Sequence, residues 1–415
     1  MYNKDTKTVL LGGAEIKDFR IVTPKDANVL ETMLANHLAL YLKDNYGYTL
    51  TVADDTLENE KEILIGNTAR TTLSVETNSF AIAFSEGKLQ LAMEGLRGFE
   101  GIFEYLDNTL LCSDKECSYS DSFTYKGMAR NTLDDGSELI NTKSGDIRVM
   151  FYNVYGWSGH GPNEVRHLLQ TEMVKAYAPD VLCLQEYGQH PPHVTYHEGF
   201  TPLMKEIGYI DASVETTYIN NTPLFYRADK LELINSGCWL YSQPNNANSK
   251  SITWAILEVK SKRKRFIAIS THMMYDQPGI DANAARIQNA KEILSVIAEI
   301  RADEAFKNLP LVMGGDLNCF VNSDPHKILA ADGGLQRAFN VAAIKNDSNN
   351  IHNYATWNDD AGVFTQWVPV NGNNSGAIDH AYVSPNTLVK TYATVKTLVP
   401  LWTSDHMPLI VEIDI

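Results

Sequence analysis

The sequence predicts an α/β protein built from a smaller N-terminal domain and a larger C-terminal domain. Strand and helix patterns alternate in both parts of the chain, and a polar stretch with little periodicity separates them. The 415 residues also provide enough material for more than one domain. In the larger part, the order of the patterns predicts two sheets packed face to face with helices outside, a four-layer α/β/β/α sandwich.

Residues 1–112 are expected to form a small α/β accessory domain. Thr23-Pro24-Lys25-Asp26 is a helix-start signal, since it combines a capping residue, a proline and an acidic side chain. Apolar residues at helical spacing follow it. A strand is then expected at 62–66, a hairpin at 80–93 and a second amphipathic helix at 99–110.

This N-terminal part resembles the small α/β accessory domain of glycoside hydrolases such as bacterial α-glucuronidases. The resemblance is carried by Glu62-Ile-Leu-Ile-Gly-Asn-Thr68 and by the hairpin followed by Gly95-Leu-Arg-Gly98. It implies a docking or scaffolding role for residues 1–112.

Residues 113–145 are rich in Ser, Asp, Asn, Thr and Gly, and we expect them to form a linker. The catalytic part is expected at 146–415. Apolar strand patterns lie at 147–154, 181–185, 252–259, 266–270, 310–313, 381–383 and 409–415, and helical stripes lie at 165–177 and 287–297.

Charge and composition restrict the function. The net charge of −16 argues against tight, non-specific binding to long nucleic acids, because such binding depends on clustered Lys and Arg. No window has the roughly 18 consecutive apolar residues of a membrane span. The five cysteines follow no disulfide framework and no apolar signal segment opens the chain, which favours the cytoplasm. A shortened secretory chain would begin in the same way.

Polar side chains follow the ends of several predicted strands or precede the last one. They are Asn153, Glu186, His272, Asp316 with Asn318, Asp379, and the pair Asp405-His406. One such ending is ordinary turn chemistry. Six of them, each beside an apolar strand, indicate a site, because the ends of central strands are where folds place reactive side chains.

A metal is expected at this site on electrostatic grounds. If Glu186, Asp316 and Asp405 converge, each pair of carboxylates at ~5 Å repels by about 3 kcal/mol at an effective dielectric near 20. A bound cation would offset that repulsion. Ligands that are rich in oxygen and lack thiolates favour Mg²⁺ first and Mn²⁺ second.

The ordered set of motifs resembles the endonuclease/exonuclease/phosphatase superfamily. The motifs are Tyr152-Asn153-Val154, Leu184-Gln185-Glu186-Tyr187, Ser270-Thr271-His272, Gly314-Gly315-Asp316-Leu317-Asn318, Ile378-Asp379-His380 and Ser404-Asp405-His406. The resemblance covers residues 147–415 and implies a metal-dependent phosphohydrolase.

The resemblance also implies a role for each residue. Glu186 would be the principal metal ligand, with Asn153 and Asp405 beside it. Asp316 would orient and deprotonate the attacking water, and Asn318 would hydrogen-bond the phosphoryl group or that water. His272 would donate to a non-bridging phosphate oxygen. His406, held by Asp379, would stabilise charge at the phosphorus or act as the base.

Further residues are candidates for the rim of the site. His190 and His193 lie in the loop after Glu186, and with His197 they raise the alternative of a zinc site. The intervening Pro-Pro disrupts helical ligand spacing, so a loop that lines the substrate is favoured. Tyr226 is a second substrate-binding candidate. Arg286 could reach back to the site or pair at the surface.

The main hypothesis is therefore a divalent-metal-dependent phosphodiesterase. A Mg²⁺-dependent nuclease acting on DNA or RNA is the alternative among enzymes, although the net charge does not favour nucleic acid. The alternative from another class is a non-catalytic binding module. The presence of Glu186, Asp316 and His406 together argues against that alternative.

Overall fold

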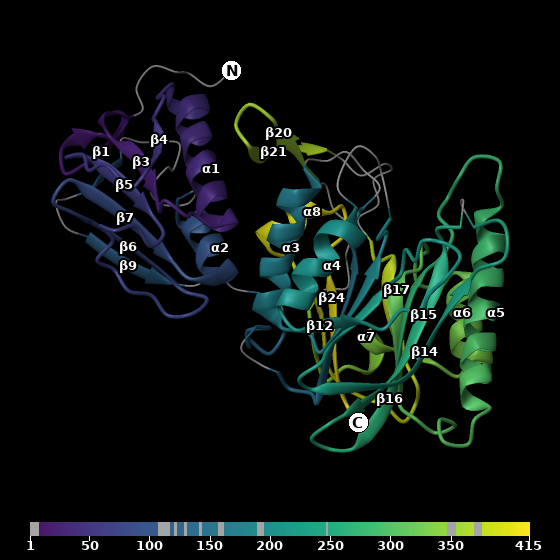
Figure 1. Ribbon diagram of the computed structural model, residues 1–415. Helices are drawn as coiled ribbons and strands as arrows, with labels where there is room; N and C mark the ends of the chain where they lie inside the picture. The colour runs from purple at the N-terminus through teal and green to yellow at the C-terminus, as the bar shows by residue number, and fades with distance from the viewer. Residues whose placement is uncertain are drawn as a thin grey trace. The chain divides into compact units, whose positions relative to one another are not determined.

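The computed structural model divides the chain into two compact units, which are described separately (Figure 1). The structure describes residues 8–106, 117–119, 123–127, 131–140, 143–156, 162–188, 195–245, 248–346, 354–368 and 376–415. The first unit comprises Met1–Arg130 and Trp357–Thr365. The second comprises Asn131–Thr356 and Gln366–Ile415.

The first unit is built on a six-stranded sheet with the order β4-β3-β5-β7-β6-β9. Its strands are β3 (Arg20–Thr23), β4 (Val52–Asp54), β5 (Glu62–Ile65), β6 (Phe80–Ser85), β7 (Lys88–Met93) and β9 (Phe123–Gly127). A small second sheet joins β1 (Val9–Leu11), β2 (Ala14–Glu15) and β8 (Cys117–Tyr119), and the short helix η1 (Ile16–Asp18) follows β2. The long helix is α1 (Val29–Tyr46), and α2 (Gly95–Tyr105) follows the β6–β7 hairpin.

Helix α1 begins later than the sequence signal indicates. Its N-cap is Asn28, whose side chain accepts hydrogen bonds from the backbone N–H groups of Leu30 and Glu31. The Glu31 side chain accepts a hydrogen bond from the Asn28 N–H in return, which completes a capping box. Thr23 instead ends strand β3. The reciprocal pair satisfies more of the free N–H groups at the helix start than a single threonine could.

Part of the predicted linker at 113–145 is sheet. Strand β8 pairs parallel to β1, and β9 pairs antiparallel to β6 at the edge of the large sheet. The linker prediction was wrong for these two segments. Both are short edge strands rich in Ser, Thr and Tyr, so hydrogen bonds to distant strands define them rather than a local apolar pattern.

The second unit contains two large sheets. The seven-stranded sheet has the order β12-β13-β11-β10-β24-β23-β19, and the six-stranded sheet has the order β14-β15-β16-β17-β22-β18. The first is formed by β10 (Ile147–Asn153), β11 (Val181–Gln185), β12 (Tyr209–Asp211), β13 (Leu224–Arg227), β19 (Ile344–Lys345), β23 (Leu388–Thr394) and β24 (Leu409–Asp414). The second is formed by β14 (Leu231–Leu240), β15 (Ser251–Val259), β16 (Lys264–His272), β17 (Leu311–Asp316), β18 (Gln336–Arg337) and β22 (Asp379–Val383).

The two sheets pack face to face, and helices cover their outer faces (Figure 1). Side chains from both sheets, among them Phe151, Cys183, Leu257 and Val312, form one buried apolar cluster between them. On one outer side lie α3 (Asn163–Tyr177), α4 (Tyr196–Glu206) and α8 (Leu398–Thr403). On the other lies α5 (Ala282–Arg301), whose apolar stripe packs on the six-stranded sheet. The predicted four-layer sandwich is confirmed.

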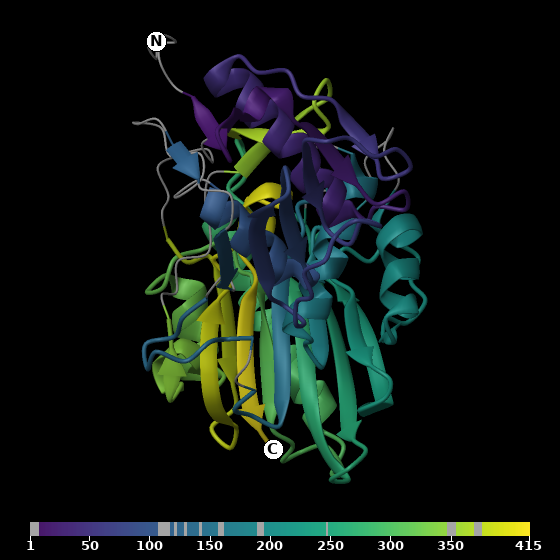
Figure 2. The same cartoon turned by 90° about the vertical axis from the view of Figure 1, so that its left-hand side faces the viewer.

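The remaining elements are short. They are α6 (Asp324–Lys327), η3 (Ile328–Asp332), α7 (Ala338–Val341) and the hairpin of β20 (Tyr354–Asn358) and β21 (Val363–Val368). Figure 2 shows the long strands of the second unit side by side, with the C-terminal strand β24 in yellow among them. Among the described helices, none combines the length and apolar character needed to cross a membrane.

Candidate active site

The six-stranded sheet brings three predicted residues to one edge. Strands β16 and β17 run parallel and both end there, with His272 paired to Asp316 in the register. Strand β22 runs antiparallel to β17 and begins there, with Asp379 paired to Asp316. Parallel neighbours therefore contribute their last residues to the edge, and the antiparallel neighbour contributes its first.

The seven-stranded sheet contributes the other half of the site. Strands β10 and β11 are parallel and end side by side, with Asn153 paired to Gln185 and with Glu186 directly after it. Strand β24 is antiparallel to β10, so the Ser404–His406 segment before it reaches the same edge. The Ser404 hydroxyl donates to the Asn153 carbonyl at 2.7 Å and so joins the two segments.

Helix α3 ties the backbone around the site together through Arg166. This side chain is fully buried. Its guanidinium donates to the carbonyl of Thr403 at 2.6 Å and to that of Tyr155 at 3.0 Å. Because these carbonyls lie beside Ser404 and Asn153, Arg166 fixes the segments that carry the polar side chains.

The two glycines before Asp316 allow the sheets to approach closely. A Cβ atom at Gly315 would lie 2.0 Å from the Thr271 carbonyl oxygen and 2.9 Å from Gln185 Nε2. The φ angle of Gly315 is +137°, which side chains rarely adopt. A Cβ at Gly314 would lie 3.0 Å from the Phe151 ring. Only glycine fits between the strands that carry the site.

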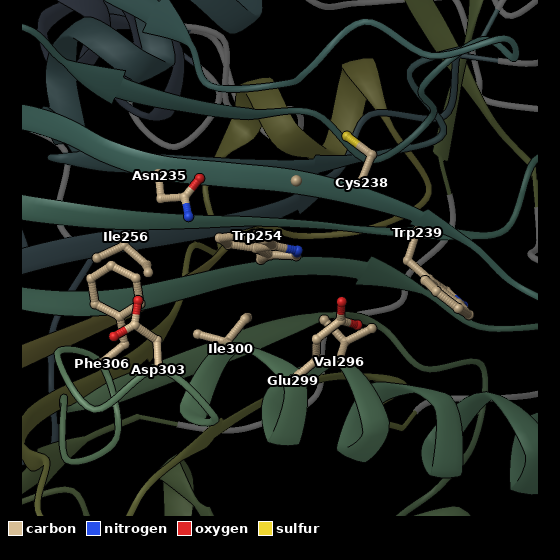
Figure 3. Close-up of a pocket in the computed structure, with 11 residues that line it drawn as sticks. Asn235, Cys238, Trp239, Trp254, Ile256, Val296, Glu299, Ile300, Asp303 and Phe306 are labelled. Carbon is tan, nitrogen blue, oxygen red and sulfur yellow. The ribbon is translucent and has the colours of Figure 1, made fainter.

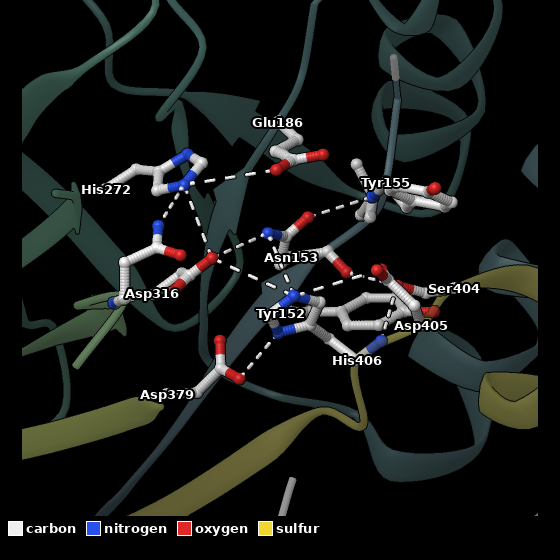
Figure 4. Close-up of polar contacts among 12 residues, drawn as sticks. Tyr152, Asn153, Tyr155, Glu186, His272, Asp316, Asp379, Ser404, Asp405 and His406 are labelled. Atoms are coloured by element: carbon white, nitrogen blue, oxygen red, sulfur yellow. Dashed lines mark hydrogen bonds and ion pairs between the residues drawn. The ribbon is translucent and has the colours of Figure 1, made fainter. Parts of the chain in front are cut away.

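Asp316 lies at the centre of the polar cluster (Figure 4). Its Oδ2 accepts a hydrogen bond from Asn153 Nδ2 at 3.0 Å and lies 3.3 Å from His272 Nε2 and 3.8 Å from His406 Nε2. Burial opposes ionisation of this carboxyl. The nearby His272, His406 and Lys250 more than offset burial, and the pKa of Asp316 is held below its usual value.

His406 is oriented by a buried carboxylate. Its Nδ1 lies 2.7 Å from Asp379 Oδ2. Burial disfavours the imidazolium, but Asp379 and Asp405 together raise the pKa of His406 well above its ordinary value. Burial also raises the pKa of Asp379 to about 6, against the opposing influence of His406.

Two residues of the cluster have left-handed backbones. Glu186 has φ 55° and Asn318 has φ 51°, a region that residues other than glycine seldom occupy. The N–H of Asn318 donates to Asp316 Oδ1 at 2.8 Å, which stabilises the turn. Strained backbone of this kind clusters at functional sites.

The donor set fits a divalent cation. Ligand atoms of Glu186, His272 and Asp316 all lie within 4.8 Å of one another. Asp405 Oδ1 is buried and accepts no hydrogen bond from the part of the chain that the structure describes. Burial raises the pKa of Asp405 to about 7, and the Glu186 charge adds to this rise. A cation would relieve the repulsion and use the free oxygen.

Lys250 belongs to the cluster and was missed by the sequence reasoning. It immediately precedes β15, which runs antiparallel to β16, with Ile252 paired to Thr271. The start of β15 therefore lies at the site edge, and Lys250 Nζ lies 2.7 Å from His272 Nε2. A charged residue just before the apolar strand at 252–259 was the available signal, but the residues that precede this strand were not considered.

The remaining predicted residues are not brought to this cluster. His190 and His193 lie outside the described residues. Tyr226 packs in the core between the sheets, paired to Val181 at the far end of β11 from Glu186, so its proposed substrate contact is not supported. Arg286 on α5 donates to the Met274 carbonyl at 3.2 Å and pairs with Asp276 at 2.9 Å, rather than with the acidic cluster.

A separate pocket of about 360 Å³ lies between β14, β15 and α5 (Figure 3). Trp239, Trp254, Glu299 and Asp303 are among its lining residues. The indole N–H of Trp239 donates to Glu292 at 2.9 Å. None of the predicted site residues lines this pocket, so it is distinct from the cluster around Asp316.

Comparison with known protein structures finds similar chains at low sequence identity. A mannosyl-6-phosphatase of Bacteroides thetaiotaomicron has a TM-score of 0.49 at 20% identity, covering 65% of this chain and 99% of that one. The human nocturnin catalytic domain with bound sulfate has a TM-score of 0.47 at 21% identity, covering 64% and 93%.

Comparison with characterised sequences finds nocturnins. Rat nocturnin is 26% identical over 237 residues, which cover 51% of this chain and 52% of that protein. Human nocturnin is 25% identical over 239 residues, with the same coverage. The chain thus spans about half the length of the curated relatives that it matches.

The family model for the endonuclease/exonuclease/phosphatase family matches residues 150–406, more than half of the chain. The matched range begins within β10 and ends at His406, so it encloses Asn153, Glu186, Asp316 and the other clustered residues. Members of this family are phosphohydrolases that generally depend on divalent metals. The predicted family and enzyme class are therefore confirmed: the chain belongs to the endonuclease/exonuclease/phosphatase family.

Proposed function

We propose that the second unit hydrolyses phosphodiesters with Mg²⁺, or alternatively Mn²⁺, as its cofactor. The observation that carries this proposal is the convergence of side chains from both sheets around Asp316. Asn153, His272 and His406 all lie within 3.8 Å of one carboxylate oxygen, although 253 positions of the sequence separate the first from the last.

Glu186, Asn153 and Asp405 would hold the cation. When bound, the cation supplies positive charge to the phosphoryl group and the leaving oxygen. The buried Oδ1 of Asp405 supports this assignment, because it accepts no hydrogen bond from the described residues. Asn153 Oδ1 also accepts the Tyr155 N–H at 3.0 Å and keeps a second lone pair for a ligand.

Asp316 would orient the attacking water and remove its proton. Its depressed pKa keeps the carboxylate ionised, and hydrogen bonds from Asn153 and from the Asn318 backbone fix its direction. Asn318 lies two residues further along the turn, where its side chain would contact the water or the phosphoryl group.

His406 would stabilise the negative charge that develops on the phosphorus oxygens. Its bond to Asp379 orients the ring and favours the imidazolium form. A fixed positive donor in a buried site lowers the barrier because it needs no reorganisation during the reaction.

We further propose small or carbohydrate-linked diesters over long nucleic acids. The net charge of −16 repels a polyanion, whereas a small ester interacts only with the local site. A nuclease activity would contradict this part of the proposal while leaving the hydrolytic chemistry intact.

The test compares bis(p-nitrophenyl) phosphate with p-nitrophenyl phosphate in Mg²⁺, Mn²⁺ and EDTA. We expect the diester to be cleaved faster, and chelation to abolish cleavage. DNA, inositol phosphates and a phospholipid run in parallel address the substrate class. Turnover that EDTA does not change would contradict the proposed metal dependence. Faster cleavage of the monoester than of the diester would identify the enzyme as a phosphatase instead of a diesterase.

A further inference from the structure

A buried lysine lies in the wall of the proposed site. Lys250 is only 3% exposed and precedes β15 at the edge where β16 ends in His272. Its Nζ lies 2.7 Å from His272 Nε2 and 3.2 Å from His272 Nδ1, and 5.2 Å from the centre of the Tyr275 ring. Glu186 and Asp316 favour its charged form, although burial lowers the pKa of Lys250 to about 8.

Among the residues that the structure describes, no carboxylate contacts the Lys250 ammonium directly. Within the described ranges, no Asp or Glu oxygen lies within 4.0 Å of its Nζ. An ammonium buried without an ion-pair partner is costly, because desolvation is not offset by a close negative charge. An anionic ligand at this position would supply that charge.

The ring nitrogens of the imidazole beside Lys250 face other side chains of the cluster. His272 Nε2 faces Lys250 Nζ and also the side-chain nitrogen of Asn318 at 3.0 Å. The orientation of the Asn318 amide is set by its second bond, from the same nitrogen to the Met273 carbonyl at 3.0 Å.

His272 Nε2 also lies 3.3 Å from Asp316 Oδ2, and an ionised carboxylate only accepts, so a proton on Nε2 is directed at Asp316 and not at a phosphate oxygen. Among the described residues at this corner of the site, the Lys250 ammonium is therefore the positively charged group with N–H bonds available to a ligand. Lys250 has three N–H bonds, and the contact with His272 uses one of them.

From this geometry we propose that Lys250 donates to a non-bridging phosphoryl oxygen of the substrate and neutralises its charge, while His272 positions the ammonium. This inference rests on the proposed function, because it places the phosphoryl group between Lys250 and Asp316. It gives Lys250 the donor role that the family resemblance implies for His272.

The test measures binding of inorganic phosphate to the full chain in Mg²⁺ by titration calorimetry. We expect Lys250→Met to weaken phosphate binding roughly 10- to 100-fold, the effect of losing one hydrogen bond to a charged group. Lys250→Arg should retain most of the affinity. Lys291→Met, which removes an exposed lysine on α5, is the matched control and should bind as the wild type does.

A purely structural role for Lys250 gives a different result. If Lys250 only supports His272, then Lys250→Met should bind phosphate as tightly as the wild type, and that result would overturn the proposal. Lys250→Gln keeps a donor without the charge and provides a second measurement should the methionine variant fold poorly. It should lose affinity as well.

The calorimetric result is separable from the hydrolytic one. A wild type that binds phosphate through Lys250 but cleaves no phosphoester would contradict the proposed reaction and support the anion contact. A wild type that cleaves the diester, with kcat/KM unchanged in Lys250→Met, would contradict the contact and leave the reaction standing.

Discussion

Three aspartates in one cluster have pKa values that their surroundings shift in different directions. Asp316 is surrounded by His272, His406 and Lys250, which hold its pKa low despite burial. Asp379 and Asp405 are dominated by burial, which raises their pKa values to about 6 and about 7. When their surroundings separate the pKa values of identical side chains, these side chains can take different roles in one site. Asp316 is thus the carboxylate of the three that stays ionised throughout the neutral pH range and can orient a water molecule.

Replacement of Asp316 tests that assignment. We expect Asp316→Ala to lower kcat for the diester by about 10²–10⁴, the usual contribution of a general base. The exposed Asp332, replaced by alanine, is the matched control and should leave kcat unchanged. The measurement is initial rates at saturating substrate and Mg²⁺. Near-normal turnover in Asp316→Ala would refute the role.

At the scale of elements, the site depends on how closely β16, β17 and β11 approach. We expect Gly315→Ala to destabilise the second unit by more than about 4 kcal/mol, because the new Cβ would overlap the Thr271 carbonyl. Catalytic activity should be lost together with stability, since His272 and Asp316 would move apart. Denaturant unfolding and rates measure both effects.

Gly208→Ala is the control for this substitution. Gly208 also has a positive φ, +90°, but open space surrounds the position of its Cβ. It should cost only about 1 kcal/mol, the penalty for the backbone conformation alone. Equal losses in the two variants would show that close strand packing at Gly315 is unimportant.

Helix α3 contains a histidine that should make stability depend on pH. His167 is buried against the Tyr196 ring, with the ring centres 4.3 Å apart, and its Nε2 has no hydrogen-bond partner among the described residues. Burial, aided by the Arg166 charge, lowers the pKa of His167 to about 3. Between pH 6.5 and pH 3 the unfolded chain therefore binds a proton that the folded chain does not, and stability falls as the pH falls.

The expected contribution of His167 is about 1.4 kcal/mol per pH unit within that window. His167→Phe keeps an aromatic ring against Tyr196 and removes the titration. We expect its free energy of unfolding to fall less steeply between pH 6 and pH 4 than that of the wild type. The free energy of unfolding is measured by urea unfolding at several pH values. If it changes with pH by the same slope in the wild type and in His167→Phe, the buried neutral imidazole is contradicted.

At the scale of the whole molecule, cation binding should be linked to folding of the second unit. At a Mg²⁺ concentration of 100 times Kd, we expect the free energy of unfolding to rise by about 2.7 kcal/mol. Glu186→Gln should abolish this increment, because it removes the charge of the proposed principal ligand. Thermal unfolding with Mg²⁺ and with EDTA gives the comparison. If the unfolding midpoint of the wild type is the same with Mg²⁺ and with EDTA, the proposed cation site is contradicted.

We propose that the first unit is an accessory domain that docks or scaffolds and takes no part in the chemistry. Leu64 in β5 is fully buried, and Leu64→Asp should destabilise the first unit because it buries a charge. We expect kcat on a small diester to stay within about twofold of the wild type, because the effects of substitutions at independent sites do not couple. Leu57→Asp, at a position that is 71% exposed, is the control. Loss of turnover in Leu64→Asp alone would assign the first unit a catalytic role.

Local sequence patterns were sufficient to predict many of the strands and helices of the second unit. The apolar strands β10, β11, β16 and β17 are buried along their whole apolar length, so their periodicity was readable. The edge strand β14 was not predicted. It is half exposed, and its register shifts between Leu233 and Asn235, which breaks any alternation.

The sequence by itself determined the order of the polar motifs and the identity of the residues that cluster around Asp316, because each follows or precedes an apolar strand that local periodicity reveals. Only the tertiary structure decided that Lys250 joins them and that Tyr226 does not. Which end of a strand reaches the site depends on whether its neighbour runs parallel or antiparallel, and that is a long-range choice with no local signature. The protonation of His272, Asp316 and Asp405 likewise depends on burial and on charges brought from distant parts of the chain.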